Sequence, residues 1–498
     1  MSRFLVILEV SQKQAYIFGS NKVADNIVNS AVIAKCLSPD YIGLILGEKY
    51  NEEINLVYSG GGHTILEYDD RKSAEESVFL LTERIYEEFD GLEVFAKICE
   101  YQESMSPKDN LKALSAGLEA KKALRRSGFH HGSFGVEEID SNTLKPVVKK
   151  KSEAINKIKK EEYTYTSKSF IPEGYEPVFE FEKLGMEKNR SSFIAVVHID
   201  GNGMGKRVDE LYECIDDKND WNSVKKALRV FSDSIDDDFK SAYKEMSVAV
   251  ARSIEEGELK GKIKLQRDKD SGKYYFPVRR IITAGDDICF VTEGRIGLEC
   301  SRIFIEKLSS KTNKADRKGY SACAGIAIVH QKYPFYKAYE LAEKLCSNAK
   351  KEGASISPDD DGRNACLIDW HIEYGEIKDS IDDIRRDYIA DDGSVLTHKP
   401  YVIRANKETL NKTPEEKKYD HFKRNIRCIT NCEKDFGGGV VKQLRSVMKS
   451  GKTETDNFIS FHRLEDRLNA TFYKDKDSGK NKNTFFDAIE MMDTFFLV

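Results

Sequence analysis

Two neighbouring carboxylates lie at the tip of a predicted hairpin, in Gly285-Asp286-Asp287, between two apolar, strand-like runs. Like charges a few ångströms apart repel, so each carboxylate disfavours ionisation of the other, and a divalent cation removes this penalty. A third carboxylate, Asp200, ends another apolar run far upstream. If the strands are neighbours, the three carboxylates can share one cation, and the carbonyl of Ile199 can add a further oxygen ligand.

A flexible, amide-rich segment follows Asp200 directly, in Gly201-Asn202-Gly203-Met204-Gly205. Glycine lets backbone amides face an anion without a side-chain clash, and the following helix presents its positive N-terminus. Phosphoryl transfer relies on cations that neutralise a triphosphate and lower the pKa of the attacking hydroxyl. A metal-binding carboxylate beside a phosphate-binding loop therefore favours a nucleotidyltransferase. The spacing is not that of a dinucleotide-binding fingerprint, and the sequence contains no P-loop motif.

Several further residues are candidate phosphate ligands. Gly285 lies in the hairpin turn, and Lys350 lies on a predicted helix from which it can reach a terminal phosphate. Lys332 and Lys206 are weaker candidates. Each signal also has a purely structural interpretation, because Gly-Asp-Asp makes a good hairpin turn and Lys350 can be an ordinary surface lysine. Only the combination of the hairpin with the Asp-ended strand and its glycine loop favours a site.

The strands and helices that must position these residues occur in the same order twice. Hydrophobic periodicity gives the order βαββαβ plus a helix, first over residues 1–125 and again over residues 191–355. Two copies of one supersecondary order suggest duplicated domains. An antiparallel sheet with helices on one face is the ferredoxin-like architecture. In this order the third strand flanks the first, which brings the hairpin tip to Asp200.

The predicted elements indicate an α+β fold with two ferredoxin-like domains and an α-helical C-terminal domain. In the first copy the predicted strands are Phe4–Glu9, Ile54–Ser59, Thr64–Tyr68 and Glu93–Tyr101, and the helices are Asn21–Cys36, Ser73–Phe89 and Asn110–Leu124. In the second copy the predicted strands are Phe193–Ile199, Arg279–Thr283, Ile288–Thr292 and Ala322–Val329, and the helices are Trp221–Ile254, Gly297–Leu308 and Phe335–Lys351. Residues 126–190 are polar and predict a linker or small helical region. Residues 356–498 predict a helical domain, because the strand-like pattern is lost from residue 370 onward.

The composition of the chain limits which classes of protein and which partners are possible. Of 498 residues, 79 are Lys or Arg and 84 are Asp or Glu, which gives a formal net charge of -5. A protein that coats nucleic acid is normally basic, so stable nucleic-acid binding is not expected. No apolar run reaches the roughly 18 residues of a membrane span, so no membrane association is expected. The 10 cysteines are scattered without a Cys-x-x-Cys motif, which indicates a reduced, cytoplasmic protein.

The hairpin, the Asp-ended strand and three later features resemble a known family. These features are the strand Ser321–His330, the Lys332-x-Pro334 that follows it, and the Ala349-Lys350 pair on the last helix. Over residues 190–355 they resemble the second palm domain of the large subunit of type III CRISPR complexes and, more distantly, the GGDEF diguanylate cyclases. The first copy is similar to the first palm of that family through Gln14–Lys22, Ser59–His63 and His131–Val136.

The resemblance implies synthesis of a cyclic oligoadenylate, or a related cyclic nucleotide, from ATP in antiviral defence. The 3′-hydroxyl of one nucleotide attacks the α-phosphate of another, and pyrophosphate leaves. The resemblance also implies that Asp200, Asp286 and Asp287 are catalytic and bind Mg²⁺ or Mn²⁺. The loop from Gly201 to Gly205 is then expected to contact the triphosphate, and Lys350 its terminal phosphate. The implied partner is an effector protein that the product activates.

Departures from the family pattern change some of these expectations. Ala284 stands where the family usually has glycine. In the first copy Gly62-His63 replaces an acidic pair, so this degenerate palm is expected to hold the acceptor nucleotide, through Gly61, Gly62 and His63, rather than a metal. His63 can equally be a plain turn residue. Neither a His-Asp nuclease domain nor a zinc-binding cysteine set between the palms is found, which favours a stand-alone enzyme, with a homo-oligomer as an option, over a subunit of a guide-RNA complex.

Two other functions remain open at this point. One is a non-catalytic nucleotide sensor or scaffold, which binds ATP and controls a partner through the C-terminal helices. The other is a primer-extending polymerase, against which the acidic charge balance weighs because strong duplex binding needs many phosphate contacts from Lys and Arg.

Overall fold

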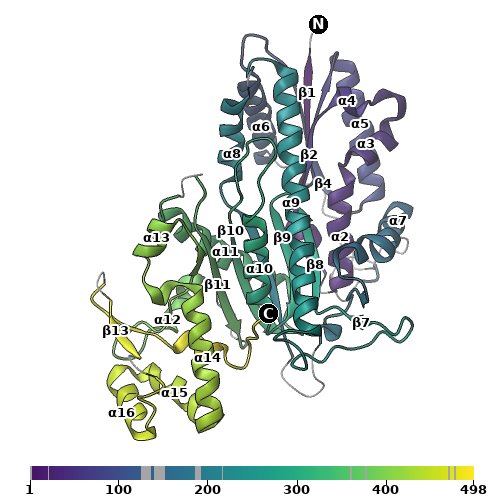
Figure 1. Cartoon of the computed structure of the whole chain (residues 1–498). Helices are drawn as coiled ribbons and strands as arrows, with labels where there is room; N and C mark the ends of the chain where they lie inside the picture. The colour runs from purple at the N-terminus through teal and green to yellow at the C-terminus, as the bar shows by residue number, and fades with distance from the viewer. Residues whose placement is uncertain are drawn as a thin grey trace.

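The fold is seen in a computed structural model, which describes residues 3–20, 22–124, 136–139, 152–185, 192–215, 217–358, 362–375, 378, 380–468, 471–475 and 478–498. Two β-sheets with packed helices occupy the upper and central parts of the view in Figure 1, and a group of helices lies at the lower left. The α+β prediction is confirmed. Of the segment His131–Val136, used for the resemblance, residues 131–135 lie outside the described residues.

The first sheet has four antiparallel strands in the order β2-β3-β1-β4. The strands are β1 (Phe4–Ser11), β2 (Leu56–Gly60), β3 (His63–Tyr68) and β4 (Glu93–Glu100), and the main helices are α2 (Val23–Cys36), α5 (Arg71–Glu88) and α6 (Pro107–Ala123). The third strand along the chain flanks the first, as the ferredoxin-like order requires. β1 lies between two neighbours and carries a run of four consecutive buried apolar residues from Leu5, which explains why its sequence does not alternate.

The second sheet repeats this order and extends it to six strands, β12-β11-β10-β6-β9-β8. Its strands are β6 (Phe193–Gly201), β8 (Val278–Ala284), β9 (Asp287–Glu293), β10 (Ala322–His330), β11 (Cys366–Glu373) and β12 (Tyr401–Arg404), and its helices are α9 (Trp221–Glu255), α10 (Gly297–Ser309) and α11 (Phe335–Ser355). The core order β10-β6-β9-β8 corresponds strand by strand to β4-β1-β3-β2 of the first sheet. The repeated βαββαβ order is therefore confirmed.

The expectation that residues from 370 onward carry no strands is wrong. β11 pairs in parallel with β10, and β12 continues the same sheet, so the sheet runs beyond residue 355. The sequence of β11 does not indicate that the strand is buried. Asp369, His371 and Glu373 interrupt its apolar residues, yet the whole strand is buried. Asp369 is neutralised inside the protein by Arg385 and by a 2.7 Å hydrogen bond from the amide of Asn348.

The C-terminal region is otherwise mainly helical, as predicted. It contains α14 (Tyr419–Phe436), α15 (Gly438–Ser450), α16 (Lys452–His462) and α17 (Phe486–Met491), together with a short hairpin of β13 (Phe472–Lys474) and β14 (Asn481–Asn483). The break between α14 and α15 falls at Gly437, whose φ of 84° ends α14. This positive φ suits glycine, because a side chain would clash with the backbone there.

The two sheets are joined by contacts between chain segments that are distant in sequence. The long helix α9, which Figure 1 shows running alongside both sheets, packs against β2. Its Lys225 is buried and lies 2.5 Å from a carboxylate oxygen of Glu67 on β3. Phe18, just before α2, packs on Tyr339 of α11 with the ring centroids 4.0 Å apart. The start of the first domain is thereby held beside α11.

Across the part of the chain that the structure describes, no single helix is long and apolar enough to cross a membrane. One bent helix pair, Val23–Cys36 with Pro39–Lys49, reaches the required length and composition only as a pair.

Candidate active site

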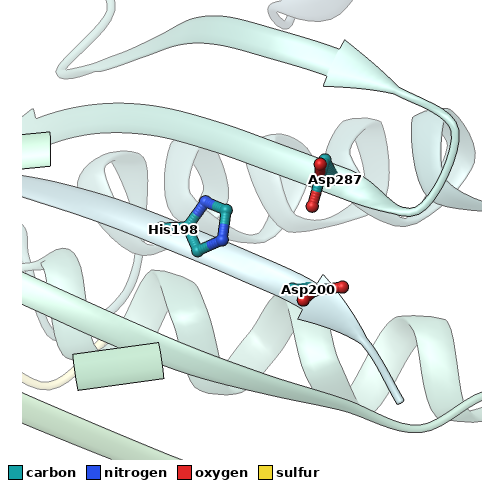
Figure 2. A group of neighbouring side chains, drawn as sticks. All are labelled: His198, Asp200 and Asp287. Atoms are coloured by element: carbon teal, nitrogen blue, oxygen red, sulfur yellow. The ribbon is translucent and has the colours of Figure 1, made fainter. Parts of the chain in front are cut away.

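Asp200 and Asp287 face each other across two paired strands. They are directly opposite in the antiparallel ladder of β6 and β9, so their side chains project from the same face of the sheet. One carboxylate oxygen of each, together with one ring nitrogen of His198, forms a group whose atoms all lie within 4.8 Å of one another. Figure 2 shows the three side chains gathered near the ends of these strands. The predicted approach of Asp200 to the hairpin is thus present in the fold.

His198 is the member of this group that sequence reasoning missed. It lies two residues before Asp200 on β6, and the twofold period of a strand puts both side chains on one face. The imidazole is 6% exposed, and its Nδ1 has no hydrogen-bond partner. Burial lowers the pKa of His198, which keeps the ring neutral. The available signal was the His-x-Asp spacing at the end of a predicted strand.

Asp286 occupies the turn itself and lies outside the group of three. Its carbonyl oxygen accepts a 3.2 Å hydrogen bond from the amide of Gly201, which ties the hairpin tip to the end of β6. Withdrawal from bulk water, then the charges of Asp287 and Asp200, raise the pKa of Asp286 to about 7. Withdrawal from water and the charge of Asp200 likewise raise the pKa of Asp287 to about 7, although part of that side chain is exposed and open to an approaching ion.

Lys350 already neutralises part of this negative charge. Its Nζ donates to Oδ2 of Asp200 at 2.6 Å and to the carbonyl of Gly201 at 2.9 Å. Burial alone would lower the pKa of Lys350, but the hydrogen bond and the attraction to Asp200 raise it. The lysine reaches the site because α11 lies close against β10, where a Cβ on Gly325 would stand 2.0 Å from the carbonyl oxygen of Ala342.

The glycine loop divides into a part that supports the fold and a part that is open. Asn202 is buried, and its backbone amide and side-chain amide donate to Ser321 and Ala365, so its polar donors are engaged inside the protein. Gly203 has a φ of 68° and precedes α8 (Met204–Leu211). A Cβ on Gly205 would meet no atom within 4 Å. The amides from Gly203 onward are therefore the ones positioned to meet a ligand.

The structure does not bring Lys332 to the carboxylates. In the β6–β10 ladder Asp200 is opposite Cys323, whereas His330 is opposite Phe193 at the other end of the strand. The seven steps along the strand from Cys323 to His330 span about 23 Å at about 3.3 Å per residue, and Lys332 lies beyond His330. Lys206 is exposed on α8 and pairs with Glu210 at 3.3 Å, one helical turn away.

The predicted acceptor residues Gly61, Gly62 and His63 lie in the hairpin of the first sheet. Gly61 and Gly62, with φ of 57° and 75°, form the tight turn between β2 and β3, and His63 follows on β3. Burial lowers the pKa of His63 to about 4, against the opposing charge of Glu9, and its Nε2 has no hydrogen-bond partner among the described residues. Its ring lies edge-on to Tyr58, with the ring centroids 5.2 Å apart.

Lys13 links the two halves electrostatically. Burial lowers its pKa, while the charges of Glu9 on β1 and Asp287 on β9 raise it, so the ammonium lies within reach of both sheets. The neighbouring Gln14 donates to Glu343 of α11 at 2.6 Å. The hairpin carboxylates and this segment of the first domain therefore form one continuous polar region.

Comparison with known proteins identifies the family of the central domain. Residues 193–357 match the family described as Cas10/Cmr2, second palm domain. Among curated proteins, none matches the sequence. The chain is similar to a chain of the Csm1-Csm4 cassette in complex with pppApA, with 14% identity and a TM-score of 0.55, over 99% of this chain and 69% of that one.

Other solved cassettes give a similar result. For the cassette in complex with cA4 the identity is 13% and the TM-score 0.54, over 99% of this chain and 70% of that one. For the cassette in complex with cA3 the identity is 15% and the TM-score 0.43, over 71% of this chain, which spans about half, 53%, of that one. At these identities the likeness concerns the fold alone. Residues 193–357 are thus similar to a second palm domain of the Cas10/Cmr2 family, and the chain as a whole shares its fold with a chain of the Csm1-Csm4 cassette.

Proposed function

We propose that this protein is a metal-dependent nucleotidyltransferase that makes a cyclic oligonucleotide, such as cyclic oligoadenylate, from ATP. The observation that carries the proposal is the pairing of Asp200 with Asp287 across two strands, directly beside an open glycine loop. The family of the central domain supports it. Structures of the same fold in complex with pppApA and cA4 favour adenylates as substrate and product.

The carboxylates fit a divalent cation, for which Mg²⁺ and Mn²⁺ are the proposed ions. Withdrawal from water and, after it, the charges of the neighbouring carboxylates raise the pKa of Asp286 and of Asp287 to about 7, and a bound cation would offset both costs. Asp200 and Asp287 are the proposed ligands, with Asp286 in the adjacent turn and the carbonyl of Ile199 as further oxygens. Such an ion, when bound, stabilises charge on the phosphoryl group and lowers the pKa of the attacking hydroxyl.

The chain's own residues bind and orient the triphosphate. The amides from Gly203 to Gly205 and the N-terminus of α8 face the negative charge of the phosphates. Lys350 donates a hydrogen bond to Asp200 in this structure. When Asp200 binds another partner, the ammonium of Lys350 is released and then contacts the terminal phosphate. Gly285 in the turn leaves room for the α-phosphate, because nothing lies within 4 Å of a Cβ built there.

The acceptor nucleotide is proposed to lie against the first sheet. Lys13 is the cation of that domain whose charge interacts with Asp287, so it is suited to hold a phosphate of the acceptor near the reacting groups. The turn at Gly61 and Gly62 and the ring of His63 are proposed to contact the same nucleotide. An effector activated by the product, and association with a further subunit or a second copy of the chain, belong to the same proposal.

The test is release of pyrophosphate from ATP with Mg²⁺ or Mn²⁺, followed by mass spectrometry of the product. Asp287→Asn is expected to lower the rate about 100-fold or more, because a charge that stabilises the transition state is lost. Asp456→Asn is the matched control, since Asp456 is an exposed aspartate on α16 that pairs only with its helix neighbour Lys452 in the described contacts. Unchanged activity of Asp287→Asn, or no pyrophosphate from any of the four nucleotides, would refute the proposal.

A non-catalytic nucleotide sensor is the second candidate. It is favoured by the ion pair between Lys350 and Asp200, which satisfies a carboxylate that catalysis requires to be available. Binding of ATP at equilibrium without any turnover, in the presence of either metal ion, would support this function over the first.

A further inference from the structure

A buried imidazole lies directly beside the carboxylate pair, and among the described residues its Nδ1 has no hydrogen-bond partner. His198 is 6% exposed, and its Nδ1 has no hydrogen-bond partner. Buried polar atoms in folded proteins are almost always partnered, so an unpartnered one needs an explanation. The ring also packs edge-on against Tyr339, with centroids 5.5 Å apart, but an aromatic contact does not satisfy a nitrogen lone pair.

We propose that His198 is a nitrogen ligand of the metal ion held by Asp200 and Asp287, and that this ligand makes the site favour Mn²⁺ over Mg²⁺. The inference rests on the proposed function, because it concerns the same site. It deepens that proposal by naming the preferred metal ion and one of its ligands. Mg²⁺ prefers oxygen ligands in a strict octahedron, whereas first-row transition metals accept imidazole nitrogen readily. A site that offers one nitrogen and two carboxylate oxygens therefore discriminates against Mg²⁺.

The geometry is close to that of a formed site. Two ligands of one ion, each at about 2.1 Å, lie at most about 4.2 Å apart. The nitrogen of His198 and the oxygens of Asp200 and Asp287 lie within 4.8 Å of one another, so small rotations of the side chains close the remaining gap. All three residues stand on two central, hydrogen-bonded strands, as Figure 2 shows, and a rigid scaffold of this kind keeps ligands in place.

Besides His198, two groups face the same space from the elements packed around it. Lys350 on α11 holds Asp200 and must move aside when an ion binds. Cys289 is the cross-strand neighbour of His198 on β9 and is fully buried, with a thiol whose pKa is raised by burial. Of these groups, His198 is the one with a nitrogen lone pair within reach of both carboxylates.

The chain offers a matched control on another strand of the same sheet. His371 of β11 is 8% exposed, and its Nδ1 also lacks a hydrogen-bond partner. Among the described residues, however, His371 belongs to no group of three metal-binding side chains. A variant of His371 therefore shows the effect of losing a buried imidazole, and a variant of His198 shows the effect of losing a metal ligand as well.

The first experiment detects the nitrogen directly. The full chain is loaded with Mn²⁺ alone, and pulsed electron paramagnetic resonance records the coupling of the bound ion to nearby ¹⁴N nuclei. Imidazole coupling is expected in the wild type and in His371→Gln, and is expected to vanish in His198→Gln. Bound Mn²⁺ without nitrogen coupling in the wild type, coupling that persists in His198→Gln, or no bound Mn²⁺ in the wild type would overturn the inference.

The second experiment measures selectivity. Calorimetric titration gives the ratio of the Mg²⁺ and Mn²⁺ dissociation constants for the wild type, for His198→Asp and for His371→Gln. Replacing the nitrogen by a carboxylate is expected to lower the preference for Mn²⁺ about tenfold, while His371→Gln keeps the wild-type ratio. An unchanged ratio in His198→Asp, with unfolding midpoints showing that the variant is folded, contradicts the inference.

The two proposals can fail independently. Nitrogen coupling is read from the bound ion without any turnover, so it can be present in a protein that never releases pyrophosphate. Conversely, pyrophosphate release that depends on Asp287, together with a coordination sphere without nitrogen, retains the proposed function and removes the role of His198.

Discussion

Replacing Asp286 by asparagine is expected to stabilise the protein, because in the folded state the carboxylate of Asp286 is withdrawn from water and repelled by neighbouring carboxylates. The pKa of Asp286 is raised from its ordinary 3.8 to about 7 by loss of bulk water and by the charges of Asp287 and Asp200. At face value this shift corresponds to about 4 kcal/mol. The side chain is only half-buried and shares its repulsion with Asp287, so the expected gain is about 1 to 2 kcal/mol.

The sign of the pH dependence follows from proton binding. Between about pH 4 and pH 7 the folded protein holds a proton on Asp286 that the unfolded chain has released, so the wild type loses stability as the pH rises through this range. Asparagine does not titrate. The advantage of Asp286→Asn over the wild type is therefore expected to be small at pH 4 and to be complete above pH 7.

The assay is thermal unfolding of both proteins at several pH values with a metal chelator present. A gain of 1 to 2 kcal/mol corresponds to a rise in the unfolding midpoint of about 2 to 8 °C. Excess Mn²⁺ is expected to remove the difference in unfolding midpoint between Asp286→Asn and the wild type, because the ion neutralises the wild-type carboxylates. The exposed control Asp456→Asn should stay within about 0.5 kcal/mol of the wild type. A lower midpoint for Asp286→Asn at pH 8, or an advantage that does not change with pH, refutes the reasoning.

Further predictions concern the phosphate loop, the lysines and the buried strand β11. Lys350→Gln is expected to weaken ATP binding about tenfold by calorimetry, whereas Lys332→Gln, at the far end of β10, is expected to leave it unchanged. Gly205→Ala should raise stability by about 0.5 to 1 kcal/mol, since Gly205 lies in a helix with open space around it, yet weaken ATP binding. Arg385→Met should cost about 3 kcal/mol in denaturant unfolding, because it leaves the buried Asp369 without its cation. Equal effects of the two lysine variants, weaker folding of Gly205→Ala, or wild-type stability of Arg385→Met would contradict the respective arguments.

Some expectations failed for reasons that are physical rather than accidental. β11 was missed because the polar residues Asp369, His371 and Glu373 break its apolar pattern. The burial of Asp369 depends on its ion pair with Arg385, which lies outside the strand. Lys332 was placed at the site because it belongs to a motif, but an antiparallel strand carries its two ends to opposite edges of the sheet. Asn202 was counted with the phosphate loop, whereas its donors are used inside the fold.

The sequence by itself determined the repeated βαββαβ order, the strand that ends in Asp200 and the hairpin that ends in Asp287. These features depend on hydrophobic period and turn chemistry, which act between residues close in the chain. Only the tertiary structure decided that Asp287 rather than Asp286 faces Asp200, that His198 joins them, and that Lys350 rests on Asp200. The register of β6 against β9 is set by partners more than 80 residues away, and no local pattern records which of those partners will meet.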